Sequence, residues 1–418
     1  MGNLKVTSGE MSSPSEPEST YAWLRLAASL LLMTVGGVGM YVMSVALPAV
    51  QAEFGSARGG ASLPYTATMI GFGLGGILMG RLADRFGVMV PTILGGVCLG
   101  AGFVLAGLSQ SLSQFTLVHG LLIGFLGCSA TFVPLVADTA LWFTRRRGIA
   151  VAICASGNYL AGTVWPPIVQ YFFQTSGWRP TYIGIGLFCT ASIVLLSFFL
   201  ARRPPAIGPA SATATHRHAV ERPLGLSANA LMILLALAGV ACCVAMSMPQ
   251  VHIVAYCGDL GYGPARGAQM LSLMLGFGIV SRLLSGWISD HIGGLRTLLL
   301  GSALQGVALL LFLPSTGLVS LYVVSALFGL FQGGIVPAYA LIVREYFDVR
   351  EAGARTGVVL MATLFGMALG GWMSGAVFDA TGSYRAAFLN GIAWNLLNLS
   401  IAFWLVRRST RRSSLAPT

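Results

Sequence analysis

Twelve stretches of this sequence are long and apolar enough to cross a lipid bilayer, and they constrain the fold more than any other feature. A helix needs about 20 apolar residues to span the hydrocarbon core. The stretches lack the polar–apolar alternation of barrel strands, so each is predicted to be a helix and the chain an all-α membrane protein. The predicted spans are residues 22–47, 62–81, 91–108, 114–137, 148–175, 181–201, 229–257, 267–289, 296–313, 317–343, 354–377 and 386–406.

The charged residues predict how this helical bundle is oriented. The chain is 56% hydrophobic and only 9% charged, which is too apolar for a soluble fold. Of its 24 Lys and Arg residues, 19 fall in the terminal segments or the even-numbered loops, and positively charged loops stay cytoplasmic. We therefore expect a multi-pass protein of the plasma membrane, the inner membrane of a bacterium, with both termini in the cytoplasm. The formal charge of +11 then reflects topology, and no nucleic-acid partner is expected.

The two halves of the chain repeat each other. The segment GRLADRFG at 80–87 returns as GWISDHIG at 286–293, and GWRP at 177–180 corresponds to SYRA at 383–386, both at an offset of 206 residues. The repeat predicts two six-helix bundles joined by a polar connection. The predicted boundaries are a disordered cytoplasmic N-terminus at 1–20, bundles at 21–201 and 228–407, a cytoplasmic linker at 202–227 and a cytoplasmic tail at 408–418.

The repeated loop resembles the signature of the major facilitator superfamily, in which two six-helix halves rock around a central site. The resemblance covers residues 20–408 and implies the major facilitator fold. In that family the loop between spans two and three forms a latch that closes the cytoplasmic side in the outward-open state. A solvated, positively charged loop is the alternative interpretation. The residues that correspond to the latch are Gly80, Arg81, Asp84, Arg85 and Gly87, with Asp290 as the counterpart of Asp84.

Further stretches resemble the monocarboxylate transporter branch of this superfamily. They are LWFTRRRGIAVAICASGNYLAG at 141–162, VHIVAYCGDLGY at 251–262, GFGIVSRLLSGWISD at 276–290 and REYFDVREAGARTG at 344–357. The branch assignment depends mainly on a histidine in span seven and an arginine in span eight. The resemblance implies that the arginine, here Arg282, binds the substrate carboxylate.

Arg282 is a permanent cation inside an apolar span. No acidic residue lies within seven positions on either side of it. A centrally placed arginine costs roughly 2.5–3.5 kcal/mol on insertion, so its guanidinium is expected to face the bundle interior or a hydrated cavity. The planar guanidinium can bind a carboxylate through two parallel hydrogen bonds. We therefore predict that Arg282 binds a substrate carboxylate, with a bond to backbone carbonyls as the structural alternative.

Two titratable residues in the spans are candidates for proton coupling. His252 follows Pro249, which interrupts span seven, and its imidazole could bind substrate, relay protons or simply bond a neighbouring helix. Asp138 lies near the inner end of span four. It is expected to pair with Arg81, Arg85 or the cluster at 145–147, with proton transfer as the alternative. Weaker candidates for the substrate site are Asn158, Tyr41, Phe331 and Phe365, for which helix packing or lipid contact is the alternative.

Two positions depart from the animal members of the branch. Those members have a lysine in span one and an aspartate four residues before the span-eight arginine. The corresponding positions here hold Tyr41 and Gly278. The ion-pair switch associated with those residues is therefore missing, and any proton coupling would follow another route through His252 or the substrate itself.

Together, these features predict a secondary transporter that moves small monocarboxylates such as lactate or pyruvate together with protons by alternating access. The alternatives are carboxylate exchange of the oxalate–formate type, export of another small organic solute, a transporter-like receptor and a membrane enzyme. The sequence contains no nucleophile–base arrangement, metal-ligand cluster or cofactor-binding loop, so no enzyme activity, metal or cofactor is expected. The expected partners are a monocarboxylate anion, H⁺ and the lipid bilayer, and the expected oligomeric state is a monomer.

Overall fold

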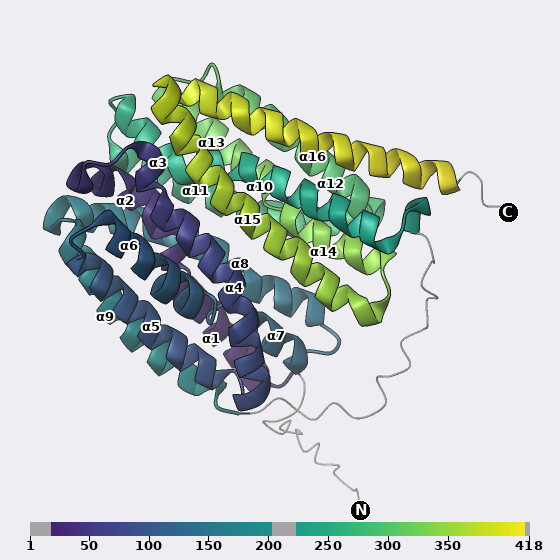
Figure 1. Ribbon diagram of the computed structural model, residues 1–418. Helices are drawn as coiled ribbons and strands as arrows, with labels where there is room; N and C mark the ends of the chain where they lie inside the picture. The colour runs from purple at the N-terminus through teal and green to yellow at the C-terminus, as the bar shows by residue number, and fades with distance from the viewer. Residues whose placement is uncertain (1–17, 203–222, 414–418) are drawn as a thin grey trace, which may run out of the picture.

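The computed structural model describes residues 18–202 and 223–413, and all regular secondary structure in these ranges is helical (Figure 1). Twelve helical stretches are long and apolar enough to cross a membrane. They form two halves of six spans each, which lie side by side in the purple-to-blue and green-to-yellow parts of Figure 1. The prediction of a twelve-helix membrane fold is confirmed.

The first half contains spans one to six. Span one is interrupted at Gly37, because glycine weakens a helix and is common at kinks. Span four, predicted as one helix, has a wide π-helical middle. The elements are α1 (Thr20–Gly36), α2 (Val38–Phe54), α3 (Arg58–Ala61), α4 (Leu63–Phe86), α5 (Met89–Leu108), α6 (Leu112–Val118), the π-helix η1 (His119–Cys128), α7 (Val133–Trp142), α8 (Arg147–Ser176), α9 (Trp178–Ser197) and the 3₁₀ turn η2 (Phe198–Leu200).

The second half contains spans seven to twelve. Here span ten is interrupted at Gly333 and Gly334, so that two helices replace the single predicted one. The elements are the 3₁₀ turn η4 (Pro223–Gly225), α10 (Ala228–Asp259), α11 (Pro264–Ile292), α12 (Gly294–Phe312), α13 (Leu318–Gln332), α14 (Ile335–Tyr346), α15 (Val349–Thr381) and α16 (Tyr384–Ser413).

The internal repeat is visible in the backbone. Gly87 ends α4 with φ 84° and ψ 161°, and Gly293, at the corresponding position of the second half, ends α11 with φ 82° and ψ 162°. These angles favour glycine, since a side chain is strained at such positive φ values. Phe143 and Phe347, which follow spans four and ten, are likewise both extended. The loops after equivalent spans therefore have the same conformation in both halves.

The two halves pack against each other mainly where α2 meets α10, α3 and α4 meet α15, and α8 meets α11. We call the side that holds both ends of the described chain the inner side, and the opposite side the outer side. The number of spans is even, so both ends lie on the same side (Figure 1). The charge pattern predicts that the inner side is cytoplasmic.

The described chain includes a few residues beyond the predicted bundle boundaries. Residues 1–17 and 203–222, which hold most of the predicted disordered N-terminus and linker, lie outside the described residues. Glu18 accepts hydrogen bonds from the backbone N–H groups of Arg145 and Arg146, and the Arg146 bond lowers the pKa of its carboxyl. The last helix continues to Ser413, beyond the predicted boundary at 407. Arg408 supports it by donating to the carbonyl oxygen of Leu224 at 2.7 Å.

Candidate functional site

Arg282 lies on α11 where this helix of the second half packs against α8 of the first. Its Nη1 donates a hydrogen bond to the backbone carbonyl oxygen of Ala155 at 3.1 Å. Its guanidinium carbon lies 4.4 Å from the centre of the Tyr159 ring, which is a cation–π contact. Both contacts cross from one half to the other. Arg282 therefore faces the interface between the halves and is not directed into lipid.

The guanidinium of Arg282 is only partly satisfied. Its Nε is buried and has no hydrogen-bond partner, and the residue as a whole is partly exposed. Among the ion pairs of the described residues, none involves Arg282. A buried donor that is left unpaired costs about 1–3 kcal/mol, and more when it is charged. The site thus retains the capacity to bind an acceptor, and a carboxylate matches its charge and shape.

Tyr159 occupies the space that a side chain at position 278 of α11 would need. A Cβ atom added at Gly278 would lie 2.4 Å from Cε1 of Tyr159, far closer than side chains approach each other. An aspartate at this position would therefore collide with the tyrosine ring. Glycine at position 278, where animal members have an aspartate, is therefore compatible with Tyr159. The tyrosine ring, which also covers Arg282, fills the space that an aspartate side chain would need.

One of the weaker candidates, Tyr41, lies near the contacts of Arg282. Tyr41 is 9% exposed, and its ring packs against Gly162, one turn beyond Tyr159 on α8. Asn158, which precedes Tyr159, has a buried side-chain oxygen without a hydrogen-bond partner. This oxygen lies 3.7 Å from the position of a Cβ added at Gly37, within the first half, so only the arginine and the two tyrosines are placed together between the halves.

His252 lies elsewhere. It is fully buried on α10, and its two ring nitrogens contact the hydroxyl of Tyr384 at 3.2 Å and the carbonyl oxygen of Gly371 at 2.8 Å. At a rise of 1.5 Å per residue, His252 is about 10 Å from the outer end of α10, whereas Arg282 is about 27 Å from the outer end of α11. The structure therefore does not bring His252 and Arg282 into one site.

The two phenylalanines are not gathered around Arg282 either. Phe331 is partly buried and packs against the hydrophobic core. Phe365 is 54% exposed and lies in one apolar stripe of α15 with Val358 and Trp372, which are 48% and 41% exposed. Spacing of seven residues keeps such side chains on one helix face. This stripe fits contact with lipid, so Phe365 is not included in the candidate site.

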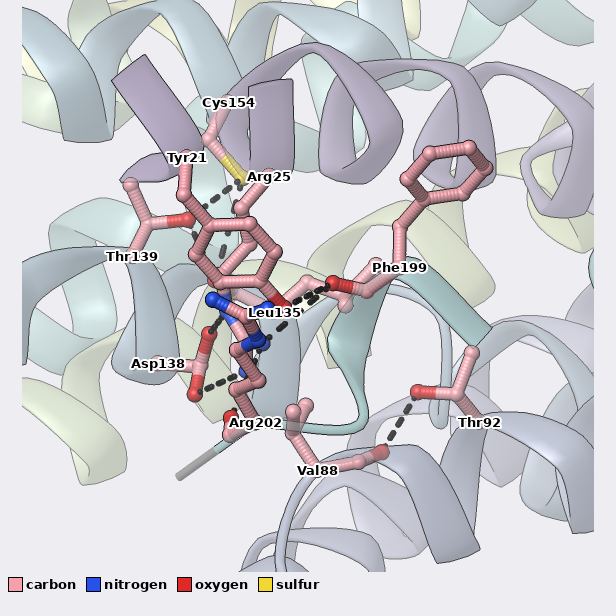
Figure 2. A network of polar contacts seen from close by, with 10 residues as sticks. All are labelled: Tyr21, Arg25, Val88, Thr92, Leu135, Asp138, Thr139, Cys154, Phe199 and Arg202. Atoms are coloured by element: carbon pink, nitrogen blue, oxygen red, sulfur yellow. Dashed lines mark hydrogen bonds and ion pairs between the residues drawn. The ribbon is translucent and has the colours of Figure 1, made fainter. Parts of the chain in front are cut away.

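Asp138 is paired, but with a residue that the sequence did not suggest. Its carboxylate receives two hydrogen bonds from Arg25 of α1, from Nε at 2.8 Å and from Nη2 at 2.9 Å, as Figure 2 shows. The predicted partners were Arg81, Arg85 and the cluster at 145–147. Arg25 is one of the 19 positive residues that the charge pattern assigns to the cytoplasmic side, yet it is only 2% exposed. Because 113 residues separate the pair, no local pattern indicates it.

The predicted latch is not engaged. Arg81, Asp84, Arg85 and Asp290 are exposed, and Gly80 and Gly87 are partly exposed. Within the part of the chain that the structure describes, no hydrogen bond or ion pair joins these residues to the opposite half. Asp84 and Arg85 instead line a cavity of about 530 Å³ at the inner end of the first half. Among the described residues, the latch sequence therefore makes no hydrogen bond or ion pair to the second half in this conformation.

Tyr159 and Arg25 are the residues near these sites that the sequence analysis missed. Tyr159 is four positions after Ala155 and therefore shares a helix face with it, which a helical projection of span five would show. Arg25 lies inside the first predicted span, at 22–47, so its depth was available from the sequence.

Comparison with known proteins identifies the class of protein that this fold and interface define. Residues 29–320 and 287–418 match the Major Facilitator Superfamily, so the chain belongs to this superfamily of membrane transporters. Monocarboxylate transporter 13 of Bos taurus is 30% identical over 315 residues, which cover 74% of this chain and 71% of that protein. The resemblance to the monocarboxylate transporter family is thereby confirmed.

Two further comparisons are more distant. The MFS-type transporter opdF of Penicillium oxalicum is 25% identical over 339 residues, covering 79% of this chain and 77% of that protein. A bacterial homologue of the human lysosomal transporter Spinster, in an inward-facing and occupied conformation, superimposes with a TM-score of 0.73. It is 14% identical, and the match covers 94% of this chain and 98% of the other, which supports the fold alone.

Proposed function

We propose that this protein is a secondary transporter of small monocarboxylate anions and that Arg282 binds the carboxylate group. The observation that carries the proposal is the free Nε of a guanidinium that faces the interface between the halves and has no acidic partner among the described residues. The relatives named as monocarboxylate transporters support the same substrate class.

The free edge of Arg282 has the geometry that a carboxylate needs. Nη1 is occupied by the carbonyl oxygen of Ala155, which leaves Nε and Nη2 on the adjacent edge. Two parallel N–H donors on one edge match the two oxygens of a carboxylate. The ring of Tyr159 covers one face of the guanidinium and restricts its rotation. A bound anion would therefore meet a preoriented donor pair.

Binding at this position would also affect both halves. Arg282 belongs to the second half, while Ala155 and Tyr159 belong to the first. An anion on the free edge of Arg282 would therefore be held by the same guanidinium that contacts the first half. Substrate binding thereby becomes linked to the relative position of the halves, which alternating access requires. We further propose that a proton accompanies the anion, since this cancels the transported charge.

The experiment is uptake of labelled lactate and pyruvate by purified protein in liposomes, with and without an inward proton gradient. Arg282→Gln is expected to reduce uptake by about 100-fold, as loss of a charge-assisted pair costs about 3 kcal/mol. Arg266→Gln is the matched control. Arg266 is exposed on the same helix and contacts only Gln269 in the described structure, so its replacement should leave uptake unchanged.

The outcomes separate the proposal from its alternatives. Equal uptake by wild type and Arg282→Gln, with both proteins equally stable, would rule out the arginine as the carboxylate ligand. Uptake that needs internal anion and ignores the proton gradient would indicate exchange of one carboxylate for another. A receptor or an enzyme would move no labelled acid under any of these conditions.

A further inference from the structure

The outer ends of the two halves are joined by a cluster of charged and polar groups around Arg58. We call this cluster the outer clasp and define it as Arg58 and Gly59 of α3 together with Asp259, Asp379 and Tyr384 of the second half. Arg58 is 8% exposed, and its guanidinium binds the carboxylate of Asp259 through Nη1 and, at 3.3 Å, through Nη2. Nη1 also donates to the Tyr384 hydroxyl at 2.8 Å.

Asp379 holds the backbone of the same short segment. Its two carboxylate oxygens accept hydrogen bonds from the N–H groups of Arg58 at 2.8 Å and Gly59 at 2.7 Å. Close helix approach makes this possible, because a Cβ at Gly375 would lie 2.8 Å from the Cα of Gly59. Two acids of the second half thus hold one arginine segment of the first, one through its side chain and one through its main chain.

The clasp continues inward to His252. The carbonyl oxygen of Gly371 can only accept, so Nε2 of His252 must carry the proton that forms the 2.8 Å bond. Nδ1 then accepts from the hydroxyl of Tyr384. The charged and titratable groups facing this network are Arg58 of α3, His252, Tyr256 and Asp259 of α10, Asp379 of α15 and Tyr384 of α16.

The charged contacts between the halves are concentrated at this end. Other hydrogen bonds between described residues of the two halves run from Thr66 to Ala368, from Ser272 to Thr163 and from Arg282 to Ala155, and each ends on a backbone carbonyl. The ion pair across the interface belongs to the clasp. The two acids of the clasp, Asp259 and Asp379, are exposed at the outer end, so protons from the outer side can reach them without crossing the bundle.

We propose that the outer clasp is a proton-operated gate, in which protons taken up by Asp259 and Asp379 from the outer side release Arg58 and allow the halves to open outward. A neutral carboxylic acid loses the ion pair with the guanidinium and the charge-assisted bonds to the α3 backbone. These bonds to the ionised carboxylates exist only while the halves are closed at the outer end, so protonation of the acids is coupled to the open arrangement.

This gate rests on the proposed transport function and deepens it, because it would make access to the Arg282 site from the outer side depend on pH. Its test does not need a substrate. Spin labels on unnatural residues at Ser113 and Thr316, which lie exposed at the outer ends of opposite halves, report the opening as a distance in lipid nanodiscs. The distance is measured between about pH 8 and about pH 3, a range that brackets the ordinary aspartate pKa of about 3.9.

The distance distribution of the wild type should move to longer values as the pH falls. The variant Asp259→Asn/Asp379→Asn should show the long distance at every pH, and Arg58→Gln should open in the same way. Glu53→Gln is the matched control, since Glu53 pairs with Arg179 at the outer end but within one half. It should retain the response of the wild type.

A wild-type distance that does not change with pH would overturn the gate, as would a double variant that follows the wild-type curve. The outcome is distinguishable from a failure of the proposed function. A protein that opens in acid but moves no monocarboxylate keeps the gate and loses the substrate assignment. A protein that transports lactate through Arg282 with a pH-independent outer distance keeps the substrate and loses the gate.

Discussion

Arg25 and Arg282 are both arginines within apolar spans, and the chain treats them in opposite ways. Arg25 is 2% exposed, and its Nε and Nη2 hold the carboxylate of Asp138 (Figure 2). Its Nη1 donates to the carbonyl oxygen of Arg202 at 3.0 Å, and the ring of Trp142 lies 4.8 Å away. The edge of this guanidinium that suits a carboxylate is therefore already occupied by an acid of the same chain.

Arg282 has the same kinds of contact except the acid. Its Nη1 donates to the carbonyl oxygen of Ala155, and the Tyr159 ring takes the place that Trp142 has beside Arg25. The edge formed by Nε and Nη2, which in Arg25 holds a carboxylate, has no such partner here. The difference shows that the edge which holds an acid in Arg25 is free in Arg282, and this is the edge to which our proposal assigns the substrate carboxylate.

Breaking the Arg25 pair should have the largest effect. Asp138→Asn leaves a buried guanidinium without its counter-charge, so the free energy of unfolding should fall by about 3–5 kcal/mol, measured by thermal or detergent-induced unfolding. Glu351→Gln is the control, because it removes an exposed pair with Arg355 and should change stability by about 0.5 kcal/mol or less. If Asp138 carries protons instead, the variant keeps its stability and loses its dependence on the proton gradient.

Giving Arg282 an internal acid should make it resemble Arg25. The double variant Tyr159→Ala/Gly278→Asp removes the ring that blocks position 278 and adds a carboxylate four residues before Arg282. Anion affinity near neutral pH should fall at least about tenfold, because the new acid competes for the guanidinium. Affinity should recover as the pH falls and the added carboxyl is neutralised, which equilibrium binding of lactate at several pH values would reveal.

The matched control for this variant is Tyr159→Ala/Gly278→Asn, which has nearly the same shape without the charge. It should bind the anion as well as Tyr159→Ala alone, at every pH. Equal affinities for the Asp and Asn versions near neutral pH would mean that the free edge of Arg282 is not where the anion binds.

Removing the aromatic face should have the smallest effect. Tyr159→Leu loses the cation–π contact that orients Arg282, which is worth about 1 kcal/mol or roughly a fivefold loss of affinity. Tyr159→Phe keeps the ring and should bind lactate nearly as well as the wild type, as isothermal titration would show. A loss that is equal in both variants would assign the effect to the hydroxyl and not to the ring.

The sequence predicted the architecture well because the bilayer imposes simple requirements on length and polarity. All twelve spans were found, and the repeat of the loop at 80–87 as 286–293 indicated the two halves. Interruptions such as the one at Gly333 and Gly334 were not predicted, since they depend on how neighbouring helices pack. The depth of Arg282 within its span was also readable, as it follows directly from residue spacing.

Partners were much harder to predict than positions. Arg25 and Asp138 are 113 residues apart, and Arg58 and Asp379 are 321 residues apart, so neither pair leaves a local pattern. His252 shows the same limit. Its place after Pro249 suggested a role at the substrate, while its actual partners come from spans eleven and twelve. Which groups meet across the interface is decided by tertiary packing, which a single sequence does not encode in its spacing.

The bonds of Arg25 have a mechanical consequence. One guanidinium connects α1, α7 and the segment that follows η2, so the inner ends of the first, fourth and sixth spans cannot slide apart without exposing a bare charge to the membrane interior. The inner end of the first half is thereby held together, at the end opposite the close backbone approach of Gly59 and Gly375. In the proposed rocking of the halves, the inner ends of these three spans would therefore move together.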